Sequence, residues 1–273
     1  MRIRSLLPLV VVIAAACARK EAPAPVGPNV VTIVATDYAF AVPETLPPGL
    51  TTFRLANVGA EPHHAVLVKL AEGKTLADFQ AAMMSPTTPD WMSFPGSPAA
   101  IMPNDTSNAT TQLEPGQYIL VCFVPAPDGM PHVAKGMARP FVVAGAAPVA
   151  AAAEPQSDVT VTLSDYAFAF STPLTAGTHT LRVENAGPQL HEIAFERLAD
   201  GKTLADYVAW GKKPQGPPPA TSLGGLIGPM KGSHAFTTVT LAPGKYLVVC
   251  HVPDEKDQKS HAEHGMIQEI VIN

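Results

Sequence analysis

An internal repeat constrains the fold of this chain more than any other feature. The two halves of the 273 residues align at a constant offset of 128 residues, from the pair Asp37/Asp165 to the pair Cys122/Cys250. One added residue in the second half then shifts the remainder to an offset of 129. Each repeat has the length of a common domain, and 47% hydrophobic residues are enough for two cores. The chain is therefore predicted to form two similar globular domains.

Residue types that bind soft or borderline metal ions recur in register in both halves. Each half carries an upstream histidine, a cysteine, a second histidine and a methionine: His63, Cys122, His132 and Met137 in the first, and His191, Cys250, His261 and Met266 in the second. A thiolate, two imidazoles and a weak axial thioether are the ligands of a trigonal copper site. We interpret these residues in those roles, as two candidate copper sites. The alternative is that each cysteine is a small buried residue and each methionine fills a gap in a core.

The N-terminus has the pattern of an export signal. Arg2 and Arg4 precede an apolar run over residues 6–16, which is too short to span a membrane as a stable helix and is typical of a secretory signal peptide. Small residues lead directly to Cys17, which resembles the lipobox of bacterial lipoproteins and implies that Cys17 is lipidated. The alternative is an ordinary signal peptide with an incidental cysteine. Lipidation predicts an extracytoplasmic, periplasm-facing protein anchored to a membrane, and Ala18 favours the outer membrane of a Gram-negative cell.

Composition divides the chain into five segments. Two stretches rich in alanine and proline separate the export signal from the first repeat and the first repeat from the second. The predicted segments are the signal peptide with its lipidated cysteine (1–17), a tether (18–28), domain 1 (29–143), a linker (144–157) and domain 2 (158–273). One cysteine remains in each domain, so burial or metal coordination is a better explanation than a disulfide.

Within each repeat the pattern is that of short strands. Segments rich in β-branched residues lie between glycine and proline turns, which predicts an all-β domain. Thr75 and Thr203 are suitable N-caps for a short helix, because an acidic residue follows each of them three positions later. The proline-, glycine- and methionine-rich stretches that follow these helices are expected to be loops. The predicted fold is two tandem Greek-key β-sandwiches, each with a short helical insertion.

The segments around the candidate ligands resemble those of the plastocyanin-like cupredoxins. A Gly-x-Tyr-x-x-x-Cys pattern ends at Cys122 and at Cys250, and is similar to the strand that delivers the copper thiolate in that family. An Asn-x-Gly-x-x-x-His pattern ends at His63 and His191, and is similar to the segment that supplies the first imidazole. The resemblance covers residues 30–143 and 158–273 and implies at most one copper ion per cupredoxin-like domain.

One spacing differs from that family. Nine residues separate Cys122 from His132 and ten separate Cys250 from His261, whereas plastocyanin has two at this point. A long loop can fold back and present its histidine to the cysteine, or it can carry the histidine away, and the sequence leaves both arrangements open. In the second loop His264 is an alternative ligand to His261.

The remaining histidines are not supported as ligands by the repeat. His64 aligns with Glu192, and strand alternation turns His251 to the face opposite Cys250. His179 and His234 match nothing in the other half and are expected to face solvent.

Several functions follow from these observations. The formal net charge of -5, with no basic run, gives no reason to expect nucleic acid as a partner. The preferred function is single-electron transfer by a copper-binding protein, with redox proteins as partners. The alternatives are a metal-free cupredoxin-like binding module and a protein that delivers or stores copper. A multicopper enzyme needs further histidines, usually as His-x-His pairs; the chain has no such pair, so the sequence predicts no enzymatic activity.

Overall fold

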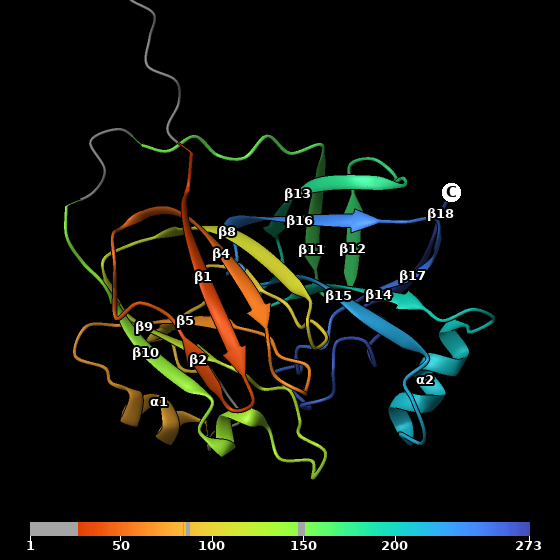
Figure 1. The fold of residues 1–273 in the computed structure, drawn as a ribbon, viewed down its shortest axis with the longest axis horizontal. Helices are drawn as coiled ribbons and strands as arrows, with labels where there is room; N and C mark the ends of the chain where they lie inside the picture. The colour runs from red at the N-terminus through yellow and green to blue at the C-terminus, as the bar shows by residue number, and fades with distance from the viewer. Residues whose placement is uncertain (1–26, 84, 86–87, 147–150) are drawn as a thin grey trace, which may run out of the picture.

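A computed structural model describes residues 27–83, 85, 88–146 and 151–273 of the chain (Figure 1). The predicted lipidation site Cys17 lies outside these residues. No helix in the described ranges is long and apolar enough to cross a membrane.

The described residues form many short strands and two short α-helices. The first half contains β1 (Asn29–Thr36), β2 (Ala39–Ala41), β3 (Thr45–Leu46), β4 (Gly49–Asn57), β5 (Val66–Leu70), α1 (Leu76–Ala82), β6 (Met92–Ser93), β7 (Ser97–Pro98), β8 (Thr106–Leu113), β9 (Gly116–Val121), the 3-10 helix η1 (His132–Lys135) and β10 (Ala138–Val143). The second contains β11 (Val159–Ser164), β12 (Ala167–Phe170), β13 (Gly177–Asn185), β14 (Glu192–Leu198), α2 (Leu204–Lys212), β15 (Ala220–Ile227), β16 (His234–Leu241), β17 (Gly244–Val249) and β18 (Ile267–Ile272). The domain boundaries drawn from composition stay a prediction.

Three sheets build two sandwiches that share one of their layers. A five-stranded sheet has the order β3-β10-β9-β5-β6, and another has the order β18-β17-β14-β15-β7. An eight-stranded sheet, β12-β11-β13-β16-β8-β4-β1-β2, contains strands of both halves, which meet where β16 pairs with β8 (Figure 1). The predicted all-β class with two cupredoxin-like sandwiches is confirmed.

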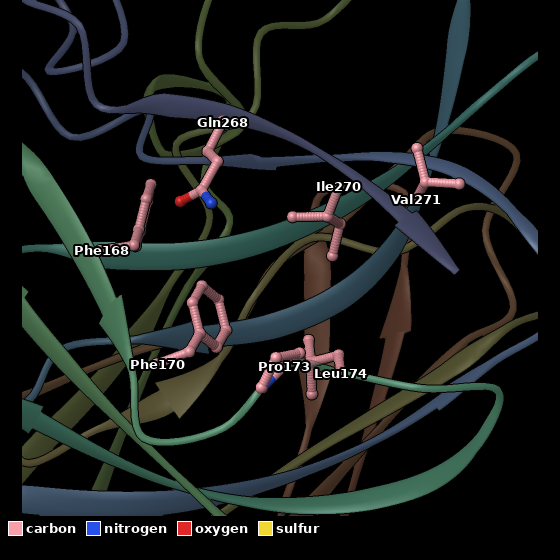
Figure 2. Close-up of a pocket in the computed structure, with 7 residues that line it drawn as sticks. All are labelled: Phe168, Phe170, Pro173, Leu174, Gln268, Ile270 and Val271. Atoms are coloured by element: carbon pink, nitrogen blue, oxygen red, sulfur yellow. The ribbon is translucent and has the colours of Figure 1, made fainter. Parts of the chain in front are cut away.

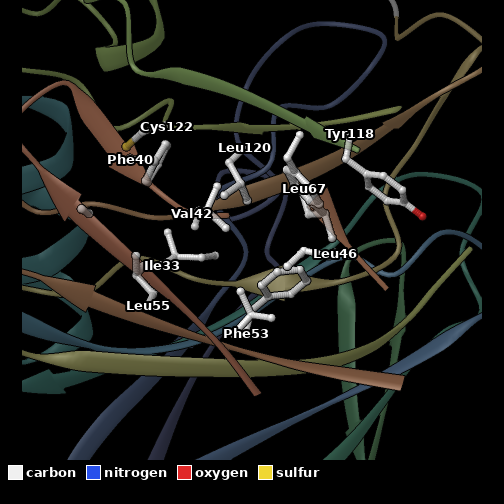
Figure 3. Close-up of a cluster of buried hydrophobic side chains, with 14 of the residues drawn as sticks. Ile33, Phe40, Val42, Leu46, Phe53, Leu55, Leu67, Tyr118, Leu120 and Cys122 are labelled. Atoms are coloured by element: carbon white, nitrogen blue, oxygen red, sulfur yellow. The ribbon is translucent and has the colours of Figure 1, made fainter. Parts of the chain in front are cut away.

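The core of the first sandwich lies between the shared sheet and the sheet that contains β9 (Figure 3). Ile33 and Phe53 come from the shared sheet, and Leu67 and Leu120 come from the facing sheet; all four side chains are fully buried. Burial of this kind contributes about 1.5–3 kcal/mol per large apolar side chain. Cys122 belongs to the same cluster, so the candidate site adjoins the core.

The two helices begin as the sequence predicts. Thr75 and Thr203 each accept a hydrogen bond from the backbone N–H three residues later, and Asp78 and Asp206 complete the capping boxes. The helices differ in what they bury: α1 places Phe79 in an apolar cluster, whereas no residue of α2 is fully buried.

Three strands lie where the sequence predicts loops: the two-residue strands β6 and β7, and the longer strand β15. β15 runs through the segment Ala-Thr-Ser-Leu-Gly-Gly-Leu-Ile, and glycines inside a strand usually mark a bulge or a close backbone approach. A Cβ on Gly225 would lie 2.0 Å from the carbonyl oxygen of Ile193, and the register between β14 and β15 shifts beside it. β15 pairs with β7 of the first half, so this strand also joins the two sandwiches.

The second sandwich has an open apolar pocket beside β18. At the equivalent place in the first sandwich, a strand fills this space. In the first half β3 pairs with β10, and the backbone N–H of Val142 donates to Glu44. Pro173 aligns with Thr45 of β3, and no strand covers β18 in the same way among the described residues. A cavity of about 420 Å³ remains there, lined by Phe168, Phe170, Pro173, Leu174, Gln268, Ile270 and Val271 (Figure 2).

The difference between the helices leads to a prediction about stability. Phe79→Ala is expected to lower the free energy of unfolding by about 3–5 kcal/mol, because it leaves a cavity in a fully packed cluster. Tyr207→Ala, at the aligned position of α2, is expected to cost less because this ring is only partly buried. Urea unfolding followed by circular dichroism measures both variants, and equal losses would contradict the packing described here.

Candidate metal centres

Strand pairing brings the candidate ligands to one end of each sandwich. β9 pairs antiparallel with both β5 and β10, so that Val121 lies opposite Val66 and Ala138. The end of β9 therefore lies beside the start of β5 and the start of β10. The segments that flank these points carry the candidate ligands: His63 precedes β5, Cys122 follows β9, and His132 and Met137 precede β10. β17, β14 and β18 repeat this arrangement in the second half.

The long loop folds back onto the cysteine. The N–H of His132 donates to the carbonyl of Val124 at 2.9 Å, and the N–H of Met137 donates to the carbonyl of His132 at 3.0 Å. The N–H of Cys122 donates to the carbonyl of Met137 at 3.2 Å, which closes the loop. The extra residues form a projection whose base is a bridge between Pro125 and Pro131.

The second loop closes in the same way. The N–H groups of His261, Met266 and Cys250 make the corresponding bonds at 2.9, 2.9 and 3.1 Å. A bridge between Pro253 and Ser260 forms the base of its projection. Of the two arrangements that the loop length leaves open, the structure shows the one that returns each histidine to its cysteine.

Three donor atoms converge in the first half. The sulfur of Cys122 lies 3.4 Å from Nδ1 of His132 and 3.9 Å from Nδ1 of His63, and the two Nδ1 atoms lie 3.0 Å apart. All three side chains are fully buried. This group is small enough to hold one metal ion, since its donor atoms all lie within 4.8 Å of one another.

The second half repeats this geometry. The sulfur of Cys250 lies 3.4 Å from Nδ1 of His261, and the Nδ1 atoms of His191 and His261 lie 3.1 Å apart. These side chains are also fully buried, and their donor atoms meet the same 4.8 Å limit. The predicted histidines and cysteines are therefore together in both halves.

The outer ring nitrogens determine which atoms face the centre. Nε2 of His63 lies 3.2 Å from Asp37, and Nε2 of His132 lies 2.8 Å from Glu61. An ionised carboxylate only accepts hydrogen bonds, so each Nε2 carries the proton and each Nδ1 presents a lone pair. Two lone pairs that face each other at 3.0 Å, beside a thiol, are the arrangement that a bound cation stabilises. The donor set therefore fits a copper ion.

Burial keeps these donors in their neutral forms. It raises the pKa of the Cys122 thiol to about 11 and that of the Cys250 thiol to about 12. Burial lowers the pKa of His63, His191 and His261, so these rings are neutral at neutral pH. Because a metal binds thiolate, its binding has to release the thiol proton.

The two methionines are close in the chain to these groups and fully buried. Met137 belongs to the same apolar cluster as Cys122, and Met266 belongs to the same cluster as Cys250. Their backbone bonds to the cysteines hold both segments together. Axial coordination by their thioethers stays a prediction.

The other histidines have different partners. Nε2 of His64 accepts from the backbone N–H of Phe123 at 2.6 Å, and His251 pairs with Glu196. His264 pairs with Asp257 at 3.0 Å, so His261 and not this alternative joins the group with Cys250. The two histidines expected to face solvent are partly exposed, and each contacts a carboxylate: His179 with Asp158 and His234 with Glu154.

The carboxylates around the ligands were not predicted from the sequence. Asp37 and Asp165 hold the first histidine of each site, and both belong to the repeat, so their equal positions were a usable signal. Glu61 carries no such signal, because Gln189 takes its place in the second half.

The glycine of the Asn-x-Gly pattern makes room for these bonds. A Cβ on Gly59 would lie 2.4 Å from Oδ1 of Asp37 and 2.8 Å from Nε2 of His63. A Cβ on Gly187 would lie 2.6 Å from Nε2 of His191. A side chain at either position therefore displaces the bond between carboxylate and imidazole.

A prediction follows from this close approach. Gly59→Ala is expected to weaken copper binding in the first half about 10- to 100-fold, the usual effect of losing a partner of a metal-bound histidine. Gly211→Ala is the matched control, because its Cβ would meet nothing within 4 Å. Competition with a copper chelator measures the affinities, and an unchanged affinity in Gly59→Ala would contradict the role of the Asp37 bond.

Comparisons with known proteins find similar structures but no similar sequence family. No protein-family model matches the chain, and no curated protein matches it. Auracyanin A, a "blue" copper protein from Chloroflexus aurantiacus, is 22% identical over 43% of this chain and 100% of its own, with a TM-score of 0.31. A multicopper oxidase is 15% identical over 89% of this chain and 88% of its own, with a TM-score of 0.26. A copper-containing nitrite reductase from Thermus scotoductus is 12% identical over 89% of this chain and 61% of its own, with a TM-score of 0.24.

These similar structures include a blue copper protein and copper enzymes. The resemblance to the cupredoxins is confirmed by the two β-sandwiches of this chain, and copper is the cofactor to consider because two His/Cys/His groups could hold a metal ion. The prediction that the chain is not an enzyme is contradicted, because an oxidase and a nitrite reductase are among the similar structures.

Proposed function

We propose that this protein binds one copper ion in each half, at sites of the type 1 kind, and transfers single electrons through them. The observation that carries the proposal is the convergence of one thiol and two Nδ1 lone pairs on a single point, in both halves. Copper bound by such ligands changes between Cu(I) and Cu(II) by one electron.

The chain supports this function by holding its ligands still. Rapid transfer of one electron requires that the ligands move little between the two oxidation states. The histidines are fixed at Nε2 by carboxylates or by packing. The loop that carries His132 forms backbone hydrogen bonds with both the N–H and the carbonyl of Cys122. Bonds from backbone N–H groups to the cysteine sulfur, such as that of Glu192 to Cys250 at 3.2 Å, hold the thiolate in place.

Burial of the ligands favours electron transfer over copper delivery. Both histidines and the cysteine of each site have no exposed surface, so water is excluded and a second protein has no direct access to the ligands. An electron can pass through the surrounding protein, whereas handing over a copper ion requires the ligands to open. A metal-free binding module is also disfavoured, because packing alone gives no reason for two imidazole lone pairs to face each other.

We infer the place of action from the sequence alone. The lipobox at Cys17 supports a protein anchored by lipid to the envelope membrane and facing the periplasm, with redox proteins as its partners. A lipid anchor would hold the copper sites close to membrane-bound electron donors and acceptors.

The proposal predicts the visible spectrum of the copper-loaded protein. Addition of Cu(II) is expected to produce an intense thiolate-to-copper band and to load one copper ion per half. Cys122→Ala and Cys250→Ala should each remove about half of the band and one ion, and the double variant should remove both. Each single variant is the control for the other half, because the second site remains intact.

Two outcomes would contradict the proposal. Copper bound in the expected amount without the band would indicate storage or delivery through other ligands. A protein that binds no copper would leave a cupredoxin-like scaffold with a metal-free function.

A further inference from the structure

The two sites differ in what holds their second histidine. In the first half Oε2 of Glu61 lies 2.8 Å from Nε2 of His132. Gln189 takes the aligned position in the second half, and its amide donates to Asp254 at 2.9 Å. Nε2 of His261 is buried without a hydrogen-bond partner, 4.0 Å from the nearest oxygen of Asp254.

Most other features of the two sites are equal. The first histidine pairs with an aspartate in both halves, and the cysteine sulfur lies 3.4 Å from Nδ1 of the second histidine in both. Tyr38 meets the ring of His132 edge-on at 5.1 Å, and Tyr166 meets the ring of His261 edge-on at 5.2 Å. The two sites therefore have similar surroundings but differ clearly in the partner of the second histidine.

This difference acts on the stability of the two copper oxidation states. A carboxylate that accepts the Nε2 proton makes the imidazole a stronger base and a better ligand for the more positive ion. This effect favours Cu(II) over Cu(I). Each second histidine has one carboxylate near its Nε2, and a tyrosine donates to that carboxylate: Tyr38 to Glu61 and Tyr166 to Asp254. Glu61 contacts Nε2 of His132 directly, whereas Asp254 stays 4.0 Å from Nε2 of His261 and accepts from Gln189 and from the N–H of Lys256.

We propose that Glu61 is a positioning residue that lowers the reduction potential of the first site below that of the second, so that electrons pass from domain 1 to domain 2. This inference rests on the proposed copper function. The transfer oxidises one copper ion and reduces the other by one electron, and it makes or breaks no bond. The copper ion of the first site is the electron donor, and the copper ion of the second site is the electron acceptor.

A continuous backbone path joins the first histidines of the two sites. His63 and Ile101 exchange two hydrogen bonds, of 3.1 and 3.0 Å, and Ile101 forms a bridge with Leu223 of β15. β15 ends beside the second site, where the N–H of Gly228 donates to the carbonyl of His191 at 2.9 Å. The strand that pairs the two sandwiches therefore also connects their ligand segments.

Glu192 is a second difference between the halves, because it lies next to Cys250 where His64 stands in the first half. A test of Glu61 therefore has to change Glu61 alone and leave the rest of the first site unchanged. Cys250→Ala leaves only the first site, and Cys122→Ala leaves only the second. Redox titration of these two variants, followed at the thiolate-to-copper band, assigns one potential to each site.

Glu61→Gln is then added to Cys250→Ala. We expect the first site to have the lower potential in the single variants, and Glu61→Gln to raise it by about 59 mV for each tenfold change in the ratio of Cu(II) to Cu(I) affinity. A loss of about tenfold is expected for one such bond. Glu44→Gln in the same background is the matched control, since it removes the same charge from a side chain that is 87% exposed.

The outcomes separate this inference from the function on which it rests. An unchanged potential in Glu61→Gln, with the band and the copper content retained, overturns the role of Glu61. A first site with a potential equal to or above that of the second overturns the direction of transfer. Absence of the band in the unmodified protein would instead refute the copper function itself.

Discussion

The antiparallel pairing of one strand with two neighbours determines the rest of this structure. β9 lies between β5 and β10, and β17 lies between β14 and β18. Because each central strand ends where both neighbours begin, the cysteine that follows it meets the two histidine segments. Backbone bonds from the cysteine to the methionine segment close this end of the sandwich. Backbone pairing therefore brings the segments that carry the candidate ligands to one end of each sandwich.

The repeat places the same centre in two different settings. The halves share a sheet, and β15 of the second half pairs with β7 of the first. Small differences at aligned positions accompany local differences in structure: Gln189 in place of Glu61 alters the support of a ligand, and Pro173 in place of Thr45 lines an open apolar pocket. The two halves share the geometry of the candidate ligands and differ in what surrounds it.

Local patterns in the sequence predict much of this arrangement, and long-range contacts account for what they miss. The capping boxes at Thr75 and Thr203 and the strands that end just before Cys122 and Cys250 depend on neighbours in the chain, and they are found where predicted. β15 was missed because its glycines have the composition of a loop and its pairing with β7 involves a distant segment. Glu61 was missed because its contact with His132 forms only when the long loop folds back.

Copper K-edge X-ray absorption on the copper-loaded protein tests the central claim most directly. We predict that each copper ion has one sulfur at short distance and two imidazole nitrogens as its nearest neighbours, since one cysteine sulfur and two Nδ1 atoms converge in each half. A first shell that contains only nitrogen and oxygen would show that the cysteines do not bind copper, and would contradict the account.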